Sequence, residues 1–160
     1  MPDPSLLEPI LQAWRTNQRI NVRLIQAIAP EGLRDTLSKR GGRSVARQFA
    51  HLHTVRIWHL ESRAKTLAAG ARKFETEDEP GAAELIRRLE DSAGRIEEFF
   101  TRAAEGVQGV RMPKRGPVQM LAYLVAHESH HRGNILLTLK QCGHAVPQEE
   151  RYAIWDWDRI

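Results

Sequence analysis

Cysteine is nearly absent from this chain, since Cys142 is the only one among 160 residues. A single thiol cannot form an intrachain disulfide, so a disulfide framework is excluded and a reducing cytoplasm is the expected location. Cys142 directly precedes Gly143, a residue type that commonly ends helices. We therefore interpret this cysteine as a structural position and not as a nucleophile.

Long apolar runs and blocks of like charge are also missing. No segment approaches the roughly 20 apolar residues that a membrane-spanning helix needs, and the N-terminus lacks the basic and apolar regions of a signal peptide. The 24 basic and 20 acidic residues are spread along the chain. The small basic cluster of Arg111, Lys114 and Arg115 lies among Gly and Pro, which favours a solvated connection. We expect neither a membrane nor a nucleic acid as partner.

The remaining sequence has an ordinary globular composition, 41% hydrophobic, and is long enough to bury the core of one domain over residues 1–160. Apolar residues recur at helical spacing in four long patterns, without a convincing strand pattern or an internal repeat. The predicted helices run from Leu7 to Ala29, from Ser44 to Ala68, from after Gly81 to about Ala103, and from Pro117 to Gly143. The expected fold class is all-α, a four-helix bundle with a short C-terminal tail segment.

Several residues mark the expected helix boundaries. Ser44 follows two glycines and is a candidate N-cap, while Gly143 is a favoured residue for ending the last helix. Ser5 and Glu8 have the spacing of a capping box at the first helix. The long stretch from Gly70 to Gly81 is interpreted as a crossover loop between the second and third helices.

The most informative segment is His127-Glu128-Ser129-His130-His131 in the last predicted helix. His127 and His131 are four residues apart, so both imidazoles project from the same helical face at a spacing that suits one divalent metal ion. If the apolar side is centred near Leu121, Val125, Ile135 and Leu139, both histidines lie on one flank of it. His130 then points almost directly away and is expected to be solvated.

A third ligand from the second helix would most naturally be His51. This residue lies on the flank shared with Trp58, whereas His53 lies on the other side and His59 points closer to the core. Three neutral imidazoles leave an open position on a metal, which is typical of catalytic sites.

Polar residues at inward positions are further candidates. Asn17 and Asn21 occupy places in the first helix where Leu would be expected. We interpret both as lining a polar pocket at the metal, with control of helix register as the alternative. Trp58 is expected to form part of the core or the pocket wall. Glu128 either forms an i,i+4 ion pair with Arg132, or acts beside the metal as a base or as the acceptor that orients a ligand histidine.

Three segments of the chain resemble the DinB/YfiT-like metal-binding four-helix bundles. Phe49-Ala50-His51-Leu52, with Trp58 following, is similar to the first-ligand helix of that family. The segment 127–135 is similar to its H-x-x-x-H-R-G-[QN]-[IL] helix, and 139–147 with 154–157 resembles its C-terminal end.

The resemblance implies that His51, His127 and His131 converge on one divalent ion, such as zinc, nickel or iron, often within a homodimer. Characterised relatives include transferases that attach low-molecular-weight thiols to electrophiles, and a thiol-dependent isomerase. The implied function is therefore that of a metal-dependent thiol S-transferase with a low-molecular-weight thiol cosubstrate and a small-molecule electrophile as substrate. A metal-bound thiolate or water would be the nucleophile.

Two other functions remain open from the sequence. His127-Glu128-x-x-His131 matches the H-E-x-x-H signature of zinc proteases, in which the glutamate is the general base. Leu137 occupies the place of the third ligand in one such class, and Glu149 is a distant substitute without an obvious helix to present it. The other alternative is a non-catalytic bundle that binds metal or acts as an interaction module.

Overall fold

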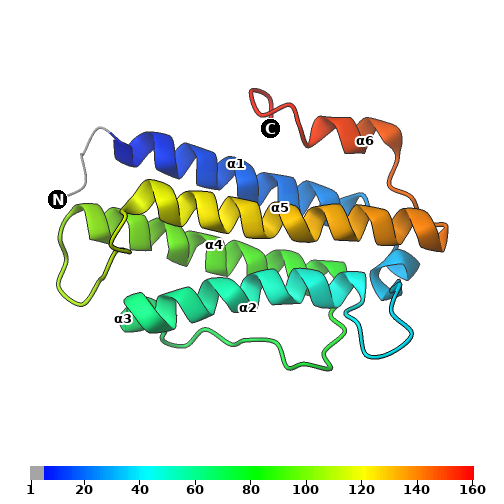
Figure 1. The fold of residues 1–160 in the computed structure, drawn as a ribbon, viewed down its shortest axis with the longest axis horizontal. Coiled ribbons are helices and arrows are strands. Elements are labelled where there is room, and N and C mark those ends of the chain that lie inside the picture. The colour runs from blue at the N-terminus through cyan, green and yellow to red at the C-terminus, as the bar shows by residue number, and fades with distance from the viewer. Residues whose placement is uncertain (1–5) are drawn as a thin grey trace.

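The computed structural model describes residues 6–160 and confirms the predicted all-α bundle (Figure 1). Its four long helices are α1 (Leu7–Gln26), α2 (Val45–Arg63), α4 (Ala82–Ala104) and α5 (Pro117–Cys142). The shorter elements are η2 (Pro30–Arg34), α3 (Lys65–Ala68) and, in the predicted tail, α6 (Gln148–Ala153). None of the helices within residues 6–160 combines the length and the hydropathy that a bilayer crossing requires.

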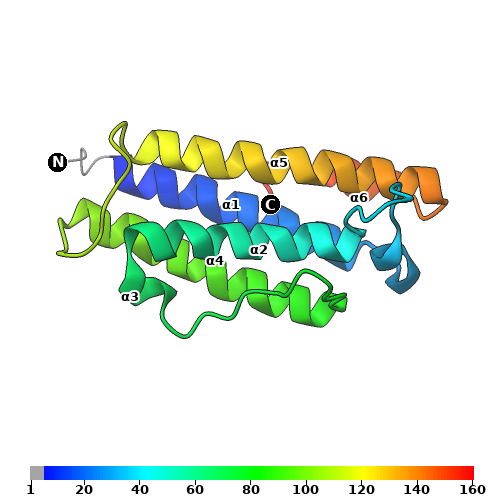
Figure 2. The ribbon, with the colours of Figure 1, turned by 60° about the horizontal axis from the view of Figure 1, so that its bottom comes forward.

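The four long helices form a ring in which α1 and α2 each contact both α4 and α5. Figures 1 and 2 show that α1 and α5 run in the same direction, and that α2 and α4 run the opposite way. The connection from α3 to α4 returns along the length of the bundle, as predicted for the crossover loop from Gly70 to Gly81. This crossover makes α2 and α5, which are distant in sequence, antiparallel neighbours.

Most predicted helix boundaries are confirmed by local contacts. The Ser44 hydroxyl accepts a hydrogen bond from the Arg47 N–H at 3.2 Å and caps α2. Gly143 ends α5 in the left-handed conformation with φ of 91°, where a side chain would be strained. Ser5 of the predicted capping box lies outside the described residues, and Glu8 accepts a hydrogen bond from Gln12 Nε2 at 2.6 Å.

Two predicted helices are shorter than expected. The segment Ser44–Ala68 is divided at Ala64, whose φ of −154° and ψ of 68° are not helical. Ala64 is completely buried, and the break brings Leu67 into the same apolar cluster. The carbonyl of Arg63 accepts a hydrogen bond from the Arg111 N–H at 2.9 Å, which compensates for the interrupted helix. In the first helix, α1 ends at Gln26, before the expected Ala29.

The core consists of two apolar clusters, one toward each end of the bundle. One contains Leu24 of α1 and Ile135 of α5, and the other contains Trp14 of α1 and Leu124 of α5. Between them lies a buried polar layer, which we define by its seven members: Asn17, Gln18, Asn21, Arg56, Ser92, Glu128 and Arg132. All four long helices contribute to this layer.

The buried side of α5 differs slightly from the predicted one. Its buried residues follow the line Met120, Leu124, Glu128, Ile135 and Leu139. Ile135 and Leu139 were expected at the centre of the apolar side and are buried, whereas Leu121 and Val125 are only partly buried. The difference arises because Glu128 and Arg132 are polar and nevertheless face the core. A prediction that counts only apolar residues therefore misplaces the buried face of α5 around the helix axis.

Candidate metal centre

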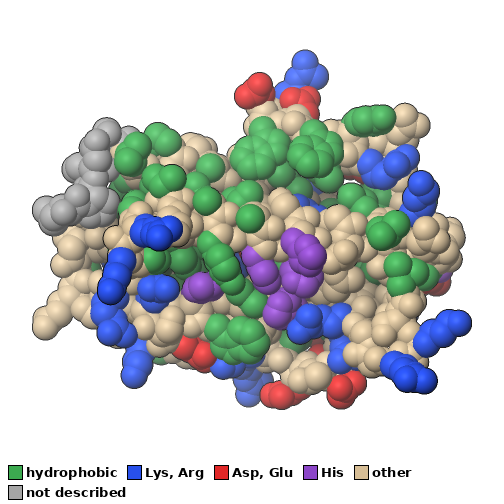
Figure 3. Space-filling model, in the orientation of Figure 1, with side chains coloured by type: hydrophobic (Ala, Val, Ile, Leu, Met, Phe, Trp, Pro, Cys, Tyr) green, Lys and Arg blue, Asp and Glu red, His purple; other side chains and the backbone are tan. Residues whose placement is uncertain are grey.

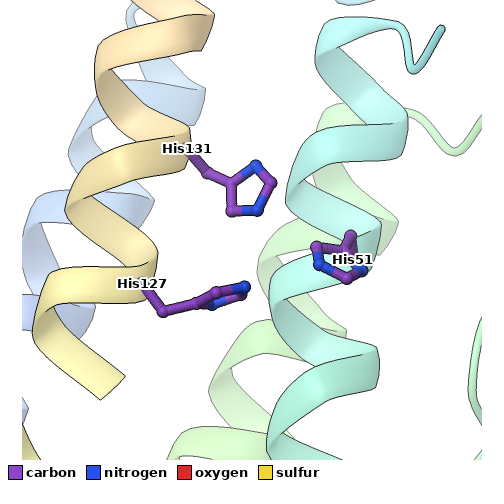
Figure 4. A group of neighbouring side chains, drawn as sticks. All are labelled: His51, His127 and His131. Atoms are coloured by element: carbon purple, nitrogen blue, oxygen red, sulfur yellow. The ribbon is translucent and has the colours of Figure 1, made fainter. Parts of the chain in front are cut away.

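Three histidines from two neighbouring helices converge on the surface of the bundle (Figure 4). His51 comes from α2, whereas His127 and His131 come from consecutive turns of α5. One nitrogen from each ring lies within 4.8 Å of the other two. The ring centroid of His51 lies 5.3 Å from that of His127 and 4.9 Å from that of His131. The structure therefore brings together the three residues that the sequence nominated, and we call them the histidine triad.

The triad is held in the uncharged form at neutral pH. Burial, with the charges of Arg43 and His127, lowers the pKa of His51 to about 4. Burial and the neighbouring histidines likewise lower the pKa of His131 to about 4, and burial lowers the pKa of His127. A neutral imidazole has a free lone pair on one ring nitrogen, which is the form that binds a metal ion.

The hydrogen bonding of the triad also fits a divalent ion. His127 Nδ1 is buried and has no hydrogen-bond partner among the described residues. His131 Nδ1 lies 3.4 Å from Gln48 Oε1, a long contact that holds one side of this ring. An unpaired buried ring nitrogen is costly unless something binds it, and imidazole suits zinc, nickel and iron. The residues present therefore fit one divalent cation.

Aromatic side chains border the triad on one side. The Trp58 ring meets the His51 ring edge-on at 6.2 Å, and half of the Trp58 side chain is exposed. Tyr123 stacks parallel to His127 at 6.1 Å, and His59 packs edge-on against Tyr123 at 5.1 Å. The triad thus lies beside an aromatic wall and open to solvent, as the histidine cluster in Figure 3 shows.

Two hollows flank the triad. The Trp58 hollow, of about 140 Å³, includes His51, Trp58, Phe74, Glu75 and Asp78 in its wall. The Arg43 hollow, of about 370 Å³, includes Leu37, Ser38, Gln48, His131 and Leu137 in its wall. The side chain of Arg43 belongs to the walls of both. Small molecules could therefore approach the triad from two directions.

Glu128 lies between the two α5 histidines in sequence but on the core side of the helix. Its carboxylate is only 1% exposed and accepts two hydrogen bonds from Arg56, at 2.7 and 2.9 Å. The amides of Asn17 and Asn21 donate to the same carboxylate at 2.6 and 2.7 Å. Burial opposes ionisation, but the charge and hydrogen bonds of Arg56 outweigh it and lower the pKa of Glu128.

These contacts correct one interpretation of the polar residues and bear out another. Asn17 and Asn21 do not line an accessible pocket, because both side chains are completely buried and their amides are directed to Glu128. Glu128 forms the predicted i,i+4 ion pair with Arg132, at the long distance of 4.0 Å, and among the described residues it makes no hydrogen bond to a triad histidine. The principal partner is Arg56, because the packing of α2 against α5 buries the two opposite charges together.

The other histidines lie outside the triad. His53 is completely buried, and its ring nitrogens lie 2.9 and 2.8 Å from the carbonyl oxygens of Arg88 and Arg72. His130 is exposed, as predicted, and contacts Asn134. His144 pairs with Asp35 at 2.8 Å. Sequence reasoning did not nominate Gln48 or Arg43, which border the triad from the start of α2 and the loop before it.

The sequence profile of the DinB family matches residues 1–158 of this chain. The chain belongs to the DinB family. No curated protein matches it. The DinB match spans all four long helices, and therefore includes both helices that present the triad.

Proposed function

We propose that this DinB-family protein is a metal-dependent S-transferase that joins a low-molecular-weight thiol to a small electrophile. The observation that carries this proposal is the placement of three neutral imidazoles between two separate hollows. A transferase must bring two reactants to one point, and the two hollows provide an approach for each. His51, His127 and His131 would hold one divalent ion, of zinc, nickel or iron.

When bound, a divalent cation supplies Lewis acidity that stabilises the anion of a thiol or a water at neutral pH. The chain's own residues then position the reactants. Gln48 contacts the His131 ring, and Trp58 and Tyr123 form the aromatic wall beside His51 and His127. The thiolate sulfur forms a bond to the electrophilic carbon, the bond to the leaving group breaks, and the thiol proton passes to solvent.

The protease alternative has less support from the geometry. A zinc protease of the H-E-x-x-H type needs its glutamate free to act as a base on the metal-bound water. Here the Glu128 carboxylate accepts hydrogen bonds from Arg56, Asn17 and Asn21 and is buried in the polar layer. The observation therefore favours a structural role for Glu128 over a catalytic one.

The proposal is tested on protein purified without added metal. Elemental analysis should find one divalent ion per chain, and transfer of 2-mercaptoethanol to chloroacetamide should follow metal content and disappear in His127→Ala. Casein cleavage should be absent with and without metal. Metal-dependent casein cleavage would favour the protease, and bound metal without any thiol transfer would favour the non-catalytic alternative.

We also propose a cytoplasmic homodimer. The support for a dimer is that Tyr152, Trp155 and Trp157 of the tail are 68%, 75% and 41% exposed, which is unusual for such large aromatic residues. Figure 3 shows hydrophobic side chains gathered on this edge of the molecule. Sedimentation of the wild type and of Trp155→Ser should separate a dimer from a monomer, and a wild-type monomer would contradict the proposal.

A further inference from the structure

The Arg43 hollow has one permanent charge in its wall, and that charge is positive. None of the described residues that line it is an aspartate or a glutamate. Its other lining groups include the polar side chains of Ser38, Gln48 and Asn134, with Leu37 and Leu137 as exposed apolar surface. The hollow therefore favours a molecule that is partly apolar and carries a negative charge.

Arg43 has no acidic partner within residues 6–160, in contrast to the nearby Arg34 and Arg47. Arg34 pairs with Glu79 at 3.1 Å, and Arg47 pairs with Glu77 at 3.5 Å. Arg43 is exposed, and no ion pair or side-chain hydrogen bond forms at its guanidinium in the described part of the chain. A cation of this kind next to a site is available to a ligand.

The position of Arg43 relative to the triad determines on which side of the triad an anionic group is favoured. Arg43 belongs to the walls of both flanking hollows, and the Arg43 hollow includes His131 whereas the Trp58 hollow includes His51. The Trp58 hollow differs, because Glu75 and Asp78 in its wall offset the positive charges of Arg43 and Arg47. An anionic group is therefore favoured on the His131 side of the triad.

We propose that the Arg43 hollow binds the carboxylate of a reactant, with Arg43 as its counterion and the reacting atom directed to the triad. This inference rests on the proposed function and names the substrate class of the same site. The planar guanidinium can donate two parallel hydrogen bonds to a carboxylate, a geometry that fixes orientation as well as charge. The carboxylate belongs to either the thiol or the electrophile, and the experiment separates these sources.

The first measurement uses metal-free protein, so it does not depend on the proposed activity. Propionate and its neutral analogue propionamide are titrated while the ring signals of His131 are followed by NMR. We expect propionate to bind about fivefold more tightly, as for an ion pair near solvent. The preference should fall with added salt. Arg43→Gln should abolish it, whereas Arg40→Gln should retain it, because Arg40 is exposed on the same loop and does not line the hollow.

The second measurement uses metal-loaded protein and locates the carboxylate. One arm compares 3-mercaptopropionate with 2-mercaptoethanol as the thiol, with chloroacetamide as the electrophile in both. The other arm compares chloroacetate with chloroacetamide, with 2-mercaptoethanol as the thiol. In each reaction a sulfur–carbon bond forms, the carbon–chlorine bond breaks and chloride leaves. Arg43→Gln should lower kcat/KM about fivefold only in the arm whose charged reactant occupies the hollow.

The outcomes distinguish failure of the inference from failure of the proposed function. If no transfer occurs but Arg43→Gln removes the propionate preference, the carboxylate site stands and the transferase proposal is wrong. Equal binding of propionate and propionamide by the wild type overturns the inference. It is also overturned if Arg43→Gln and Arg40→Gln change the binding or the two kinetic arms equally, because the effect is then one of overall charge.

Discussion

The polar layer and the histidine triad occupy the same level of the bundle, yet they differ in how completely their polar groups are paired. Glu128 accepts four hydrogen bonds from Arg56, Asn17 and Asn21, and lies in a closed interior. At the preceding position of α5, His127 has a buried ring nitrogen without a hydrogen-bond partner among residues 6–160, and its side chain borders solvent. Adjacent positions of one helix therefore face a closed interior and an open cluster of histidines.

The difference teaches which polar residues to regard as functional. A buried charge that is fully paired is costly to disturb and offers nothing to a ligand. A partly buried group that lacks a partner can gain binding energy from an external ion or molecule. Since α2 and α5 contribute residues to both the polar layer and the triad, substitutions at neighbouring positions should have different effects. Those in the layer should lower stability, and those in the triad should weaken metal binding.

The largest expected effect is on stability, from Arg56→Ala. Removal of this guanidinium leaves the Glu128 carboxylate buried without its counterion, which should cost about 3–5 kcal/mol of the free energy of unfolding. Urea unfolding of the metal-free protein measures the loss. Arg87→Ala is the matched control, because its side chain is 68% exposed and the change should stay within about 0.5 kcal/mol. A similar small loss in Arg56→Ala would show that the polar layer does not stabilise the bundle.

The next effect concerns metal binding by the triad. Free metal at about 100 times its dissociation constant should stabilise the wild type by about 2.7 kcal/mol, seen as a rise in Tm. His51→Ala and His127→Ala should lose this rise, since each removes one ligand. His130→Ala should keep it, because His130 is exposed and lies outside the triad. Loss of the rise in His130→Ala alone would mean that the ligand set is wrong.

A smaller loss of stability is expected from Glu128→Gln. This variant distinguishes the polar layer from the triad, because it changes the layer within one turn of the α5 histidines. The amide keeps the shape of the side chain but loses the charge opposite Arg56, at a cost of about 1–3 kcal/mol. Metal stoichiometry and thiol transfer should persist, because Glu128 makes no hydrogen bond to the triad in the described structure. If Glu128→Gln retained the metal but lost all catalytic activity, Glu128 would have to be the general base.

The smallest effect is the pH dependence of stability in the metal-free protein. His51 and His131 have a pKa of about 4 when folded, below the ordinary value of 6.5, so the unfolded chain binds more protons between these values. Their contribution is complete above about pH 6.5 and is lost as the pH falls toward 4. Thermal unfolding should show a shallower slope over this window in His131→Ala. An unchanged slope would place the titrating groups elsewhere.

The sequence was sufficient to predict the helices and the triad, because both depend on local spacing. Apolar periodicity located the four long helices, and the four-residue separation of His127 and His131 placed both rings on one face of α5. His51 was identified from helix phase together with the resemblance to a known family. Periodicity cannot show that α2 packs against α5, and the resemblance implied that contact.

The polar layer and the two hollows could not be predicted in the same way. Arg56 follows Leu52 by four residues and so shares its face of α2, but its partner on α5 depends on how two helices that are distant in sequence pack. The same packing directs Asn17 of α1 to Glu128 and not to a pocket. Arg43 lies on the loop before α2, where no periodicity constrains the direction of a side chain.

The crossover between α2 and α4 has a consequence for when the metal site can exist. Because it makes α2 the neighbour of α5, His51 is synthesised well before the helix that carries His127 and His131. The histidines of α5 can reach His51 only after α5 has docked on α2. The triad therefore cannot form until the chain has been synthesised through α5, and a nascent chain that stops short of α5 presents no assembled triad to a metal ion.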